Sequence, residues 1–255
     1  MEYNKFGLIS VIMAAYNAER TIEQSIRSVL NQTYTHFEII VIDDCSKDHT
    51  AEIVRRISKE DQRVKLLKNP ENKGVSYTRK HGLENACGEW LAILDSDDEW
   101  QPEKLEKQIA LQKTTNAQLL YTGSGFMDEV GNRLAWNLQV PEKLKYKQLL
   151  KQNLLSNSSA LVKKELYEKY YVIGDDMHED FAIWLGILRS GVVAHGVNEP
   201  LLIYRLAKSS KSGNKIAAAR MNWNTYRFIG LTYVKAFYYM CWYVLKGIMK
   251  YKNLK

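Results

Sequence analysis

The sequence predicts an α/β fold in which helices cover both faces of a mostly parallel central sheet. Four runs in the first hundred residues are apolar throughout, which is typical of strands buried on both faces of a parallel sheet. Segments with apolar residues at helical spacing separate these runs. Such an alternation is the pattern of repeated strand–helix–strand units, and it predicts the parallel arrangement.

The elements of the first half follow one another closely. The first helix carries Ile22, Ile26 and Val29 on one face, as an amphipathic helix requires. Ligands of such sheets bind beyond the carboxyl ends of the strands, so the segments after the strands are the first candidates for a site. Strands are expected at residues 8–14, 37–42, 64–67 and 90–94, and helices at residues 18–31, 48–60 and 74–86.

The second half of the sequence is more mixed. Gln101-Pro102-Glu103 opens a helix, because proline is common at a first helical position. The chain length fits one large domain with an appendage: a domain at residues 1–205, with halves at 1–100 and 101–205, and a helical tail at 206–255. Strands are expected at residues 119–122, 156–162, 192–197 and 201–204, a turn at 128–132, and a helix at 178–190.

Composition argues against several classes of protein. The three cysteines, Cys45, Cys87 and Cys241, are far apart, which argues for a reducing compartment and against a disulfide framework. Residues 1–9 lack the basic-then-apolar pattern of a signal peptide, so we expect a cytoplasmic protein. The first 199 residues carry 25 basic and 29 acidic side chains, and this slightly acidic balance disfavours nucleic acid as a partner.

The tail is basic and aromatic. No Asp or Glu follows Glu199, whereas eleven Lys or Arg do, and they give the whole chain its net charge of +7. Lys235 and Lys246 interrupt the aromatic-rich stretch 229–249, so a membrane-spanning helix is not expected. We expect a helix that lies peripherally on the inner face of the cell membrane, against anionic lipid. The alternative is a helix packed on the domain or on a second subunit, in a homo-oligomer.

Three carboxylates crowd the end of the strand expected at 90–94. Asp95, Asp97 and Asp98 follow Leu94 within four positions. Carboxylates this close raise each other's pKa unless a cation lies among them. Oxygen ligands suit Mg²⁺ or Mn²⁺, which complete their shell with phosphate and water, so the motif predicts a metal–diphosphate site. The alternative is a solvated acidic turn before the next helix.

Polar or small residues also end the other strands. Tyr16 can stack on a nucleobase or pack beneath its loop, and Gly74 allows a close approach of the backbone to a ligand. No Gly-x-Gly-x-x-Gly follows the first strand and no Walker motif occurs, which excludes dinucleotide dehydrogenases and P-loop enzymes. The strand-end segments are Ala14-Ala15-Tyr16-Asn17, Asp43-Asp44-Cys45-Ser46 and Asn72-Lys73-Gly74.

Two long segments resemble family 2 glycosyltransferases. They are SVIMAAYNAERTIEQSIRSVLNQTYTHFEIIVIDDCSKDHT, at residues 10–50, and NKGVSYTRKHGLENACGEWLAILDSDDEW, at residues 72–100. The resemblance spans residues 8–205 and is specific, because several motifs keep their order and spacing. It implies the GT-A fold and transfer of a sugar from a nucleotide diphosphate, usually with inversion. The chain is most similar to small bacterial enzymes that build capsule, teichuronic-acid and other surface polysaccharides.

The resemblance implies roles for residues of the nucleotide half. Asp44 would accept the N3 hydrogen of uracil, or equally a ring hydrogen of guanine, with capping of the next helix as the alternative. Asp95 would contact the ribose and the metal ion, Asp97 is the preferred metal ligand, and Asp98 can share that role. Arg79 would offer donors to the nucleotide or to Asp95, unless it is a surface residue. The other nucleotide-site candidates are Ala14, Tyr16, Gly74 and Ser96.

The acceptor half carries a second motif. Glu179-Asp180 matches the Glu-Asp motif of the family, which implies that Asp180 deprotonates the acceptor hydroxyl group and that Glu179, the reserve candidate, contacts the acceptor. The alternative is that these two acids have no catalytic role and only stabilise the start of a helix. Trp184 forms either a floor under the acceptor sugar or part of the core. Arg205 would reach the diphosphate or close a loop over it, with residues 209–213 as a mobile lid or a solvated connector.

The chain lacks the Gln-x-x-Arg-Trp motif of processive family members, which indicates that it adds one sugar. We therefore expect an inverting, Mn²⁺- or Mg²⁺-dependent enzyme. It would transfer a sugar from a UDP-sugar to a hydroxyl group of a lipid-linked or growing surface glycan. The alternatives are a nucleotidyltransferase, whose Gly-rich signature is missing, and a non-catalytic glycan- or membrane-binding module, against which the acids at 44, 95, 97 and 180 argue.

Overall fold

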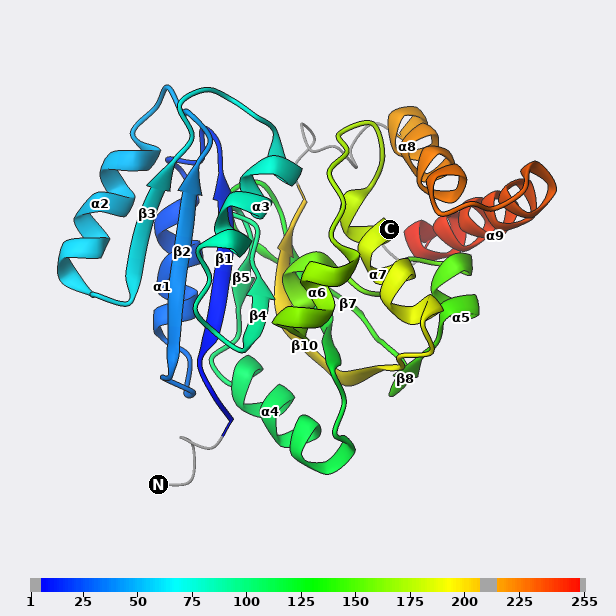
Figure 1. The fold of residues 1–255 in the computed structure, drawn as a ribbon, viewed down its shortest axis with the longest axis horizontal. Coiled ribbons are helices and arrows are strands. Elements are labelled where there is room, and N and C mark those ends of the chain that lie inside the picture. Colours follow the sequence, from blue (N-terminus) through cyan, green and yellow to red (C-terminus); the bar gives the residue numbers. More distant parts are fainter. Residues whose placement is uncertain (1–5, 207–214, 253–255) are drawn as a thin grey trace.

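A ten-stranded sheet forms the centre of the structure, a computed structural model that describes residues 6–206 and 215–252 (Figure 1). The strand order is β3-β2-β1-β4-β9-β6-β10-β5, with β7 beside β6 and β8 beside β10. The strands are β1 (Ile9–Ala15), β2 (Phe37–Asp43), β3 (Val64–Lys68), β4 (Trp90–Ile93), β5 (Glu99–Trp100), β6 (Leu119–Met127), β7 (Arg133–Leu138), β8 (Lys143–Leu144), β9 (Leu161–Lys163) and β10 (Ala194–Arg205). The helices are α1 (Ile22–Leu30), α2 (Thr50–Glu60), α3 (Val75–Glu84), α4 (Lys104–Thr115), α5 (Tyr146–Lys151), α6 (Lys164–Tyr170), α7 (Glu179–Arg189), α8 (Lys215–Phe228) and α9 (Tyr233–Lys252).

The first four strands are parallel, as their apolar runs predict. β1 pairs with β2 and β4, and β2 pairs with β3, so that β1, β2 and β3 point the same way in Figure 1. The register places Ile9 beside Phe37 and Ala15 beside Asp43, so β1 and β2 end at the same edge of the sheet. The polar residues after these strands therefore meet at that edge.

Side chains of each strand alternate between two apolar layers, because successive residues of a strand point to opposite faces. Val11 and Met13 pack with α1, α2 and α4 on one face, whereas Ile12 packs on the other face, which α3 and α5 to α9 cover. Burial on both faces explains why β1 reads as a continuous apolar run rather than an alternating one.

The second half of the sheet is mixed, and two expectations for it are wrong. The two strands expected at residues 192–197 and 201–204 are one strand, β10, which begins at Ala194, because its ladder with β6 continues past Pro200 through shifts in register. The strand expected at residues 156–162 is a 3₁₀ turn (Asn157–Ser159) followed by β9. The Ser159 hydroxyl donates to the Ser156 carbonyl at 2.7 Å, and such local bonds favour a turn.

The tail forms two helices that pack on the rest of the chain. Tyr226 of α8 and Ala236 of α9 are fully buried in the same apolar layer as α7. The opposite face of α9 exposes Val234, Phe237 and Leu245. None of the helices in 6–206 and 215–252 is both long enough and apolar enough to cross a membrane. Residues 209–213, expected as a lid or connector, lie outside the described residues.

Candidate active site

A cavity of about 710 Å³ opens at the carboxyl edge of the parallel strands, where ligands of such sheets bind. The segments after β1, β2 and β4, the starts of α3 and α7, and one residue of α8 form its walls. All candidates for the nucleotide site line it: Ala14, Tyr16, Asp44, Gly74, Arg79, Asp95 and Ser96. Asp97, Glu179 and Asp180 line it as well, whereas Asp98, Trp184 and Arg205 do not.

Hydrogen bonds between two loops shape one end of the cavity. Asn17, after β1, has a left-handed φ of 49°, which asparagine tolerates. Its amide donates to the Ser46 hydroxyl at 3.0 Å, and the Lys47 amide donates to its side-chain oxygen at 2.9 Å. Tyr16 lines the cavity with 47% of its surface exposed, so it does not pack beneath the loop and a ligand can reach it.

Asp44 is buried and organises the loop before α3. Its Oδ1 accepts hydrogen bonds from the Lys73 amide at 2.9 Å and from Asn69 Nδ2 at 2.7 Å, and its Oδ2 accepts one from the Gly74 amide at 3.0 Å. It therefore does not cap α2, whose first amide, that of Thr50, donates to Asp48 at 3.0 Å instead. Because a carboxylate has about four lone-pair sites, Asp44 keeps room for one donor of a ligand.

Gly74 adopts a conformation that only glycine accepts easily. Its φ is +82°, and a Cβ atom there would lie 2.5 Å from Oδ2 of Asp175. Glycine is therefore needed for the close approach of a protein carboxylate to this backbone, in addition to any approach of a ligand.

Arg79 is the centre of the charge network of the site. It is buried in α3, and its two terminal nitrogens donate to different carboxylates, Nη2 to Asp95 and Nη1 to Glu179. Burial alone would lower the pKa of Arg79, but the charges of Asp95 and Glu179 outweigh this effect and raise it well above its usual value. The guanidinium thus stays charged and joins the motif after β4 to the start of α7, so Arg79 is not a surface residue.

The side chains of the neighbouring residues Asp97 and Asp98 lie in different surroundings. Asp97 lines the cavity, and burial together with the charge of Asp95 raises its pKa to about 6. Asp98 is buried outside the cavity lining, and its Oδ1 accepts from the Arg205 amide at 2.9 Å. Burial, then repulsion by Asp97 and Asp95, raises the pKa of Asp98 well above its usual value. The structure therefore favours Asp97 over Asp98 as a group that faces a ligand.

The start of α7 places two acids in one helical turn, where the helix dipole favours them. Arg79 holds Glu179, whereas the side chain of Asp180 has no hydrogen bond or ion pair within 6–206 and 215–252. The His178 amide donates to the Thr225 hydroxyl at 3.1 Å, which fastens the start of α7 to α8. Asp180 thus points into the cavity from a fixed helix end.

Two candidates for contact with the substrates lie elsewhere. Trp184 has no exposed surface and packs on Tyr167 with ring centres 5.4 Å apart, so it belongs to the core and is not a floor for a sugar. Arg205 is buried, and its Nε donates to the backbone oxygen of Asp97 at 2.8 Å while Nη2 contacts Gln24 and Glu99. Its guanidinium braces the Asp95–Asp98 loop from behind and does not reach toward a diphosphate.

Comparison with known sequences identifies the family. The profile of Glycosyl transferase family 2 matches residues 10–170. The chain belongs to this family. This family 2 chain is 36% identical over 244 residues to TuaG of Bacillus subtilis (strain 168), named provisionally as a teichuronic acid biosynthesis glycosyltransferase, over 95% of this chain and 97% of TuaG. It is 34% identical over 255 residues to the Escherichia coli UDP-Glc:alpha-D-GlcNAc-diphosphoundecaprenol beta-1,3-glucosyltransferase WfgD, over 97% and 98% of the two chains.

Solved structures show the same fold. TarS of S. aureus in complex with UDP-GlcNAc superposes with a TM-score of 0.71 and 19% identity, over 91% of this chain and 70% of that chain. The mannosyltransferase PcManGT from Pyrobaculum calidifontis, in complex with GDP-Man and Mn²⁺, gives a TM-score of 0.69 and 18% identity, over 89% and 65%. The family 2 chain is thus a glycosyltransferase with the expected GT-A fold.

The oxygen ligands of the cavity fit a divalent cation that a nucleotide also binds. Within the described ranges, no three His, Cys, Asp or Glu side chains are placed to hold a metal ion by themselves. Mg²⁺ sites, however, often use one or two carboxylates and take their other ligands from phosphates and water. Asp95 and Asp97 supply such a pair. Burial, and after it the charge of Asp95, raises the pKa of Asp97, and a cation would offset the charge of the two carboxylates.

Sequence reasoning missed several lining residues, among them Asp175, Tyr204 and Met221. Asp175 lies in the loop before α7, and Tyr204 lies on β10 next to Arg205, which was a candidate. Met221 comes from α8, so the tail that was expected to be an appendage contributes to the wall of the site. No local pattern marks Met221, because its position depends on the packing of α8 against α7.

Proposed function

We propose that this glycosyltransferase transfers a single sugar from a UDP-sugar to a hydroxyl group of a lipid-linked or growing surface polysaccharide, with inversion. One observation carries the proposal: a single cavity is lined both by the carboxylate pair Asp95 and Asp97 and by Asp180, with Arg79 between the two groups. A diphosphate at the first group and an acceptor hydroxyl at the second would meet within this cavity.

The donor would lie along the edge of the parallel strands. Tyr16 offers its ring to the base, and Asp44 retains an acceptor site for a ring N–H group. Asp95 and Asp97 would hold Mn²⁺ or Mg²⁺, which when bound offsets the negative charge of the leaving diphosphate. The complexes of TarS with UDP-GlcNAc and of PcManGT with Mn²⁺ support this assignment of donor and ion.

The transfer is a single displacement. Asp180 accepts the proton of the acceptor hydroxyl group while that oxygen attacks the anomeric carbon. The bond between the anomeric carbon and the diphosphate oxygen breaks, and its electron pair leaves with UDP. Because the attack comes from the side opposite the leaving group, the anomeric configuration inverts. Arg79 keeps Asp95 and the start of α7 in fixed positions during this step.

The acceptor assignment rests on relatives and on the tail. The acceptor in the name of WfgD is a diphosphoundecaprenol-linked sugar, and TuaG is named for a cell-surface polymer. The exposed apolar face of α9, with Lys235 and Lys246 on the same helix, supports peripheral binding to the inner face of the cell membrane. Phe237→Glu should abolish flotation of the protein with anionic vesicles. Unchanged flotation would remove this part of the proposal.

The reaction is tested by incubating the protein with a panel of UDP-sugars and a synthetic lipid-diphosphate-linked sugar. We expect UDP release that requires the acceptor, stops with EDTA, returns with Mn²⁺, and yields a linkage of inverted configuration by NMR. A retained configuration would refute the single displacement. Release of pyrophosphate from a nucleoside triphosphate would favour a nucleotidyltransferase, and binding without turnover of any donor would favour a non-catalytic module.

A further inference from the structure

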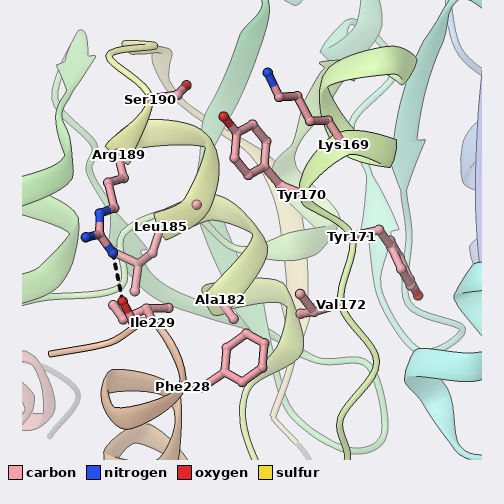
Figure 2. Close-up of a pocket in the computed structure, with 11 residues that line it drawn as sticks. Lys169, Tyr170, Tyr171, Val172, Ala182, Leu185, Arg189, Ser190, Phe228 and Ile229 are labelled. Carbon is pink, nitrogen blue, oxygen red and sulfur yellow. Dashed lines mark hydrogen bonds between the residues drawn. The ribbon is translucent and has the colours of Figure 1, made fainter.

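A second cavity, of about 460 Å³, lies on the outward face of α7 (Figure 2). The end of α6 bounds it on one side, and Phe228 and Ile229, at the end of α8, bound it on the other. It shares no lining residue with the active-site cavity. A ligand there would therefore be neither the donor nor the reacting end of the acceptor.

The cavity exists because α7 places small side chains on this face. Ala182 and Gly186 are four residues apart and so lie above one another on the helix. A Cβ atom at Gly186 would come within 3.0 Å of the Tyr170 ring, which forms one wall. Phe228 forms another wall, although 55% of this large apolar side chain is exposed. Apolar surface of this kind marks a binding surface when charged groups border it.

Two cations border the apolar walls. Lys169 and Arg189 are both exposed, and the lining contains no acidic residue. Arg189 donates to the backbone oxygen of Ile229 at 2.8 Å, which ties α7 to the turn before α9 and leaves other guanidinium donors unused by that bond (Figure 2). The combination of apolar walls and two cations suits an anion that carries an apolar chain.

The surroundings indicate where such a ligand comes from. The turn that bounds the cavity leads directly into α9, whose exposed face is the surface that we propose to contact the membrane. No Asp or Glu follows Glu199, so the tail beside the cavity is entirely basic in its charges. An anionic leaflet would place phospholipid headgroups next to this cavity at high local concentration.

We propose that this cavity binds one anionic membrane phospholipid. The phosphate lies against the Arg189 guanidinium at one end of the cavity, Lys169 at the other end adds to the positive charge, and the glycerol and first chain carbons lie against Leu185, Tyr170 and Phe228 (Figure 2). The volume, near the lower end for ligand sites, fits a headgroup with the start of a chain rather than a whole lipid. This inference rests on the proposed membrane association, and it adds a defined lipid site on the catalytic domain that fixes the orientation of the enzyme on the bilayer.

The test uses dihexanoyl-phosphatidylglycerol below its micelle concentration, titrated into the full chain by calorimetry. We expect saturable binding of one lipid per chain. Arg189→Gln, which removes a charge-assisted contact, and Lys169→Glu, which reverses a charge at the other end of the cavity, should each weaken binding by about tenfold. Lys113→Glu and Arg55→Gln, exposed residues on α4 and α2, are matched controls and should leave affinity unchanged.

Several results would overturn the lipid site. Equal weakening by the control variants would show a general charge effect, and equal affinity for dihexanoyl-phosphatidylcholine would show no selection for an anion. Displacement by farnesyl diphosphate at far lower concentration would assign the cavity to a carrier lipid instead. Failure of the lipid-site proposal can be distinguished from failure of the proposed membrane association. Phe237→Glu should abolish flotation with vesicles while leaving the binding of the short-chain lipid intact.

Discussion

Replacing Arg79 with lysine tests the bridge between the two halves of the active site. In the structure separate nitrogens of one guanidinium bind Asp95 and Glu179. The ammonium group of lysine is a single point of charge and lacks the planar fork that spans both acids. Arg79→Lys should therefore keep one of the two contacts and lose the other.

The magnitude follows from the lost contact. A hydrogen bond to a charged group contributes about 1.5–3 kcal/mol, so kcat should fall by roughly 10- to 150-fold if the contact serves to position α7. The unfolding free energy should fall by about 1–3 kcal/mol, because one buried carboxylate is left without its partner. The KM for the donor should change less than kcat, since Arg79 is occupied by protein carboxylates.

The assay is steady-state UDP release, with urea unfolding of the same samples. Lys80→Arg is the control, because Lys80 is the partly exposed neighbour on α3 and pairs only with Glu84 of the same helix among the described residues. Glu179→Gln should lower kcat much less in the Arg79→Lys background than in the wild type, since both substitutions disrupt the same contact. A higher donor KM with unchanged kcat would mean that Arg79 binds the donor, and additive effects would mean that no bridge operates.

Three further predictions concern single groups. Asp97→Asn should weaken Mn²⁺ binding in the presence of UDP by about tenfold or more, measured by calorimetry. Asp98 lies outside the cavity lining, so Asp98→Asn should weaken Mn²⁺ binding by less than about threefold. Equal losses in the two variants would contradict the assignment of Asp97 as the metal ligand. Gly74→Ala should lower the unfolding free energy by roughly 1–3 kcal/mol in urea, since it strains a φ of +82° and meets Asp175, and an unchanged value would refute the strain. Burial lowers the pKa of Lys104 in the folded protein well below its usual 10.5. Between that lowered pKa and 10.5 the unfolded chain binds more protons than the folded chain. The free energy of unfolding therefore rises with pH in this range, by up to about 1.4 kcal/mol per pH unit. Urea melts at pH values just below 10.5, from about pH 9 to about pH 10, should show this rise in the wild type but not in Lys104→Met, and equal slopes would contradict it.

The parallel half of the fold could be predicted from the sequence because β1, β2 and β4 are buried on both faces. Burial makes these strands largely apolar, and their parallel order brings the following residues to one edge. The short helices α5 and α6 were not predicted, since six and seven residues leave too little periodicity.

The composition of the site could be predicted better than its internal contacts. Residue types and strand ends pointed to Asp95, Asp97 and Asp180, which line one cavity. The pairing of Arg79 with Glu179 joins residues 100 positions apart, and no local pattern encodes it. The prediction that Arg205 reaches the diphosphate is wrong for a similar reason. Only the packed structure shows that the donors of Arg205 bind the Asp95–Asp98 loop from behind.

The most direct test of the account is sugar transfer by Asp180→Asn with the donor already bound. The substitution keeps the size of the side chain and removes its basicity. The account predicts a transfer rate about 100- to 10,000-fold lower than in the wild type, with the Kd of the donor unchanged within about threefold. Asp176→Asn, a change of an exposed acid in the loop before α7, should transfer normally. Transfer by Asp180→Asn at a rate within about threefold of the wild type would contradict the role of Asp180 as the base.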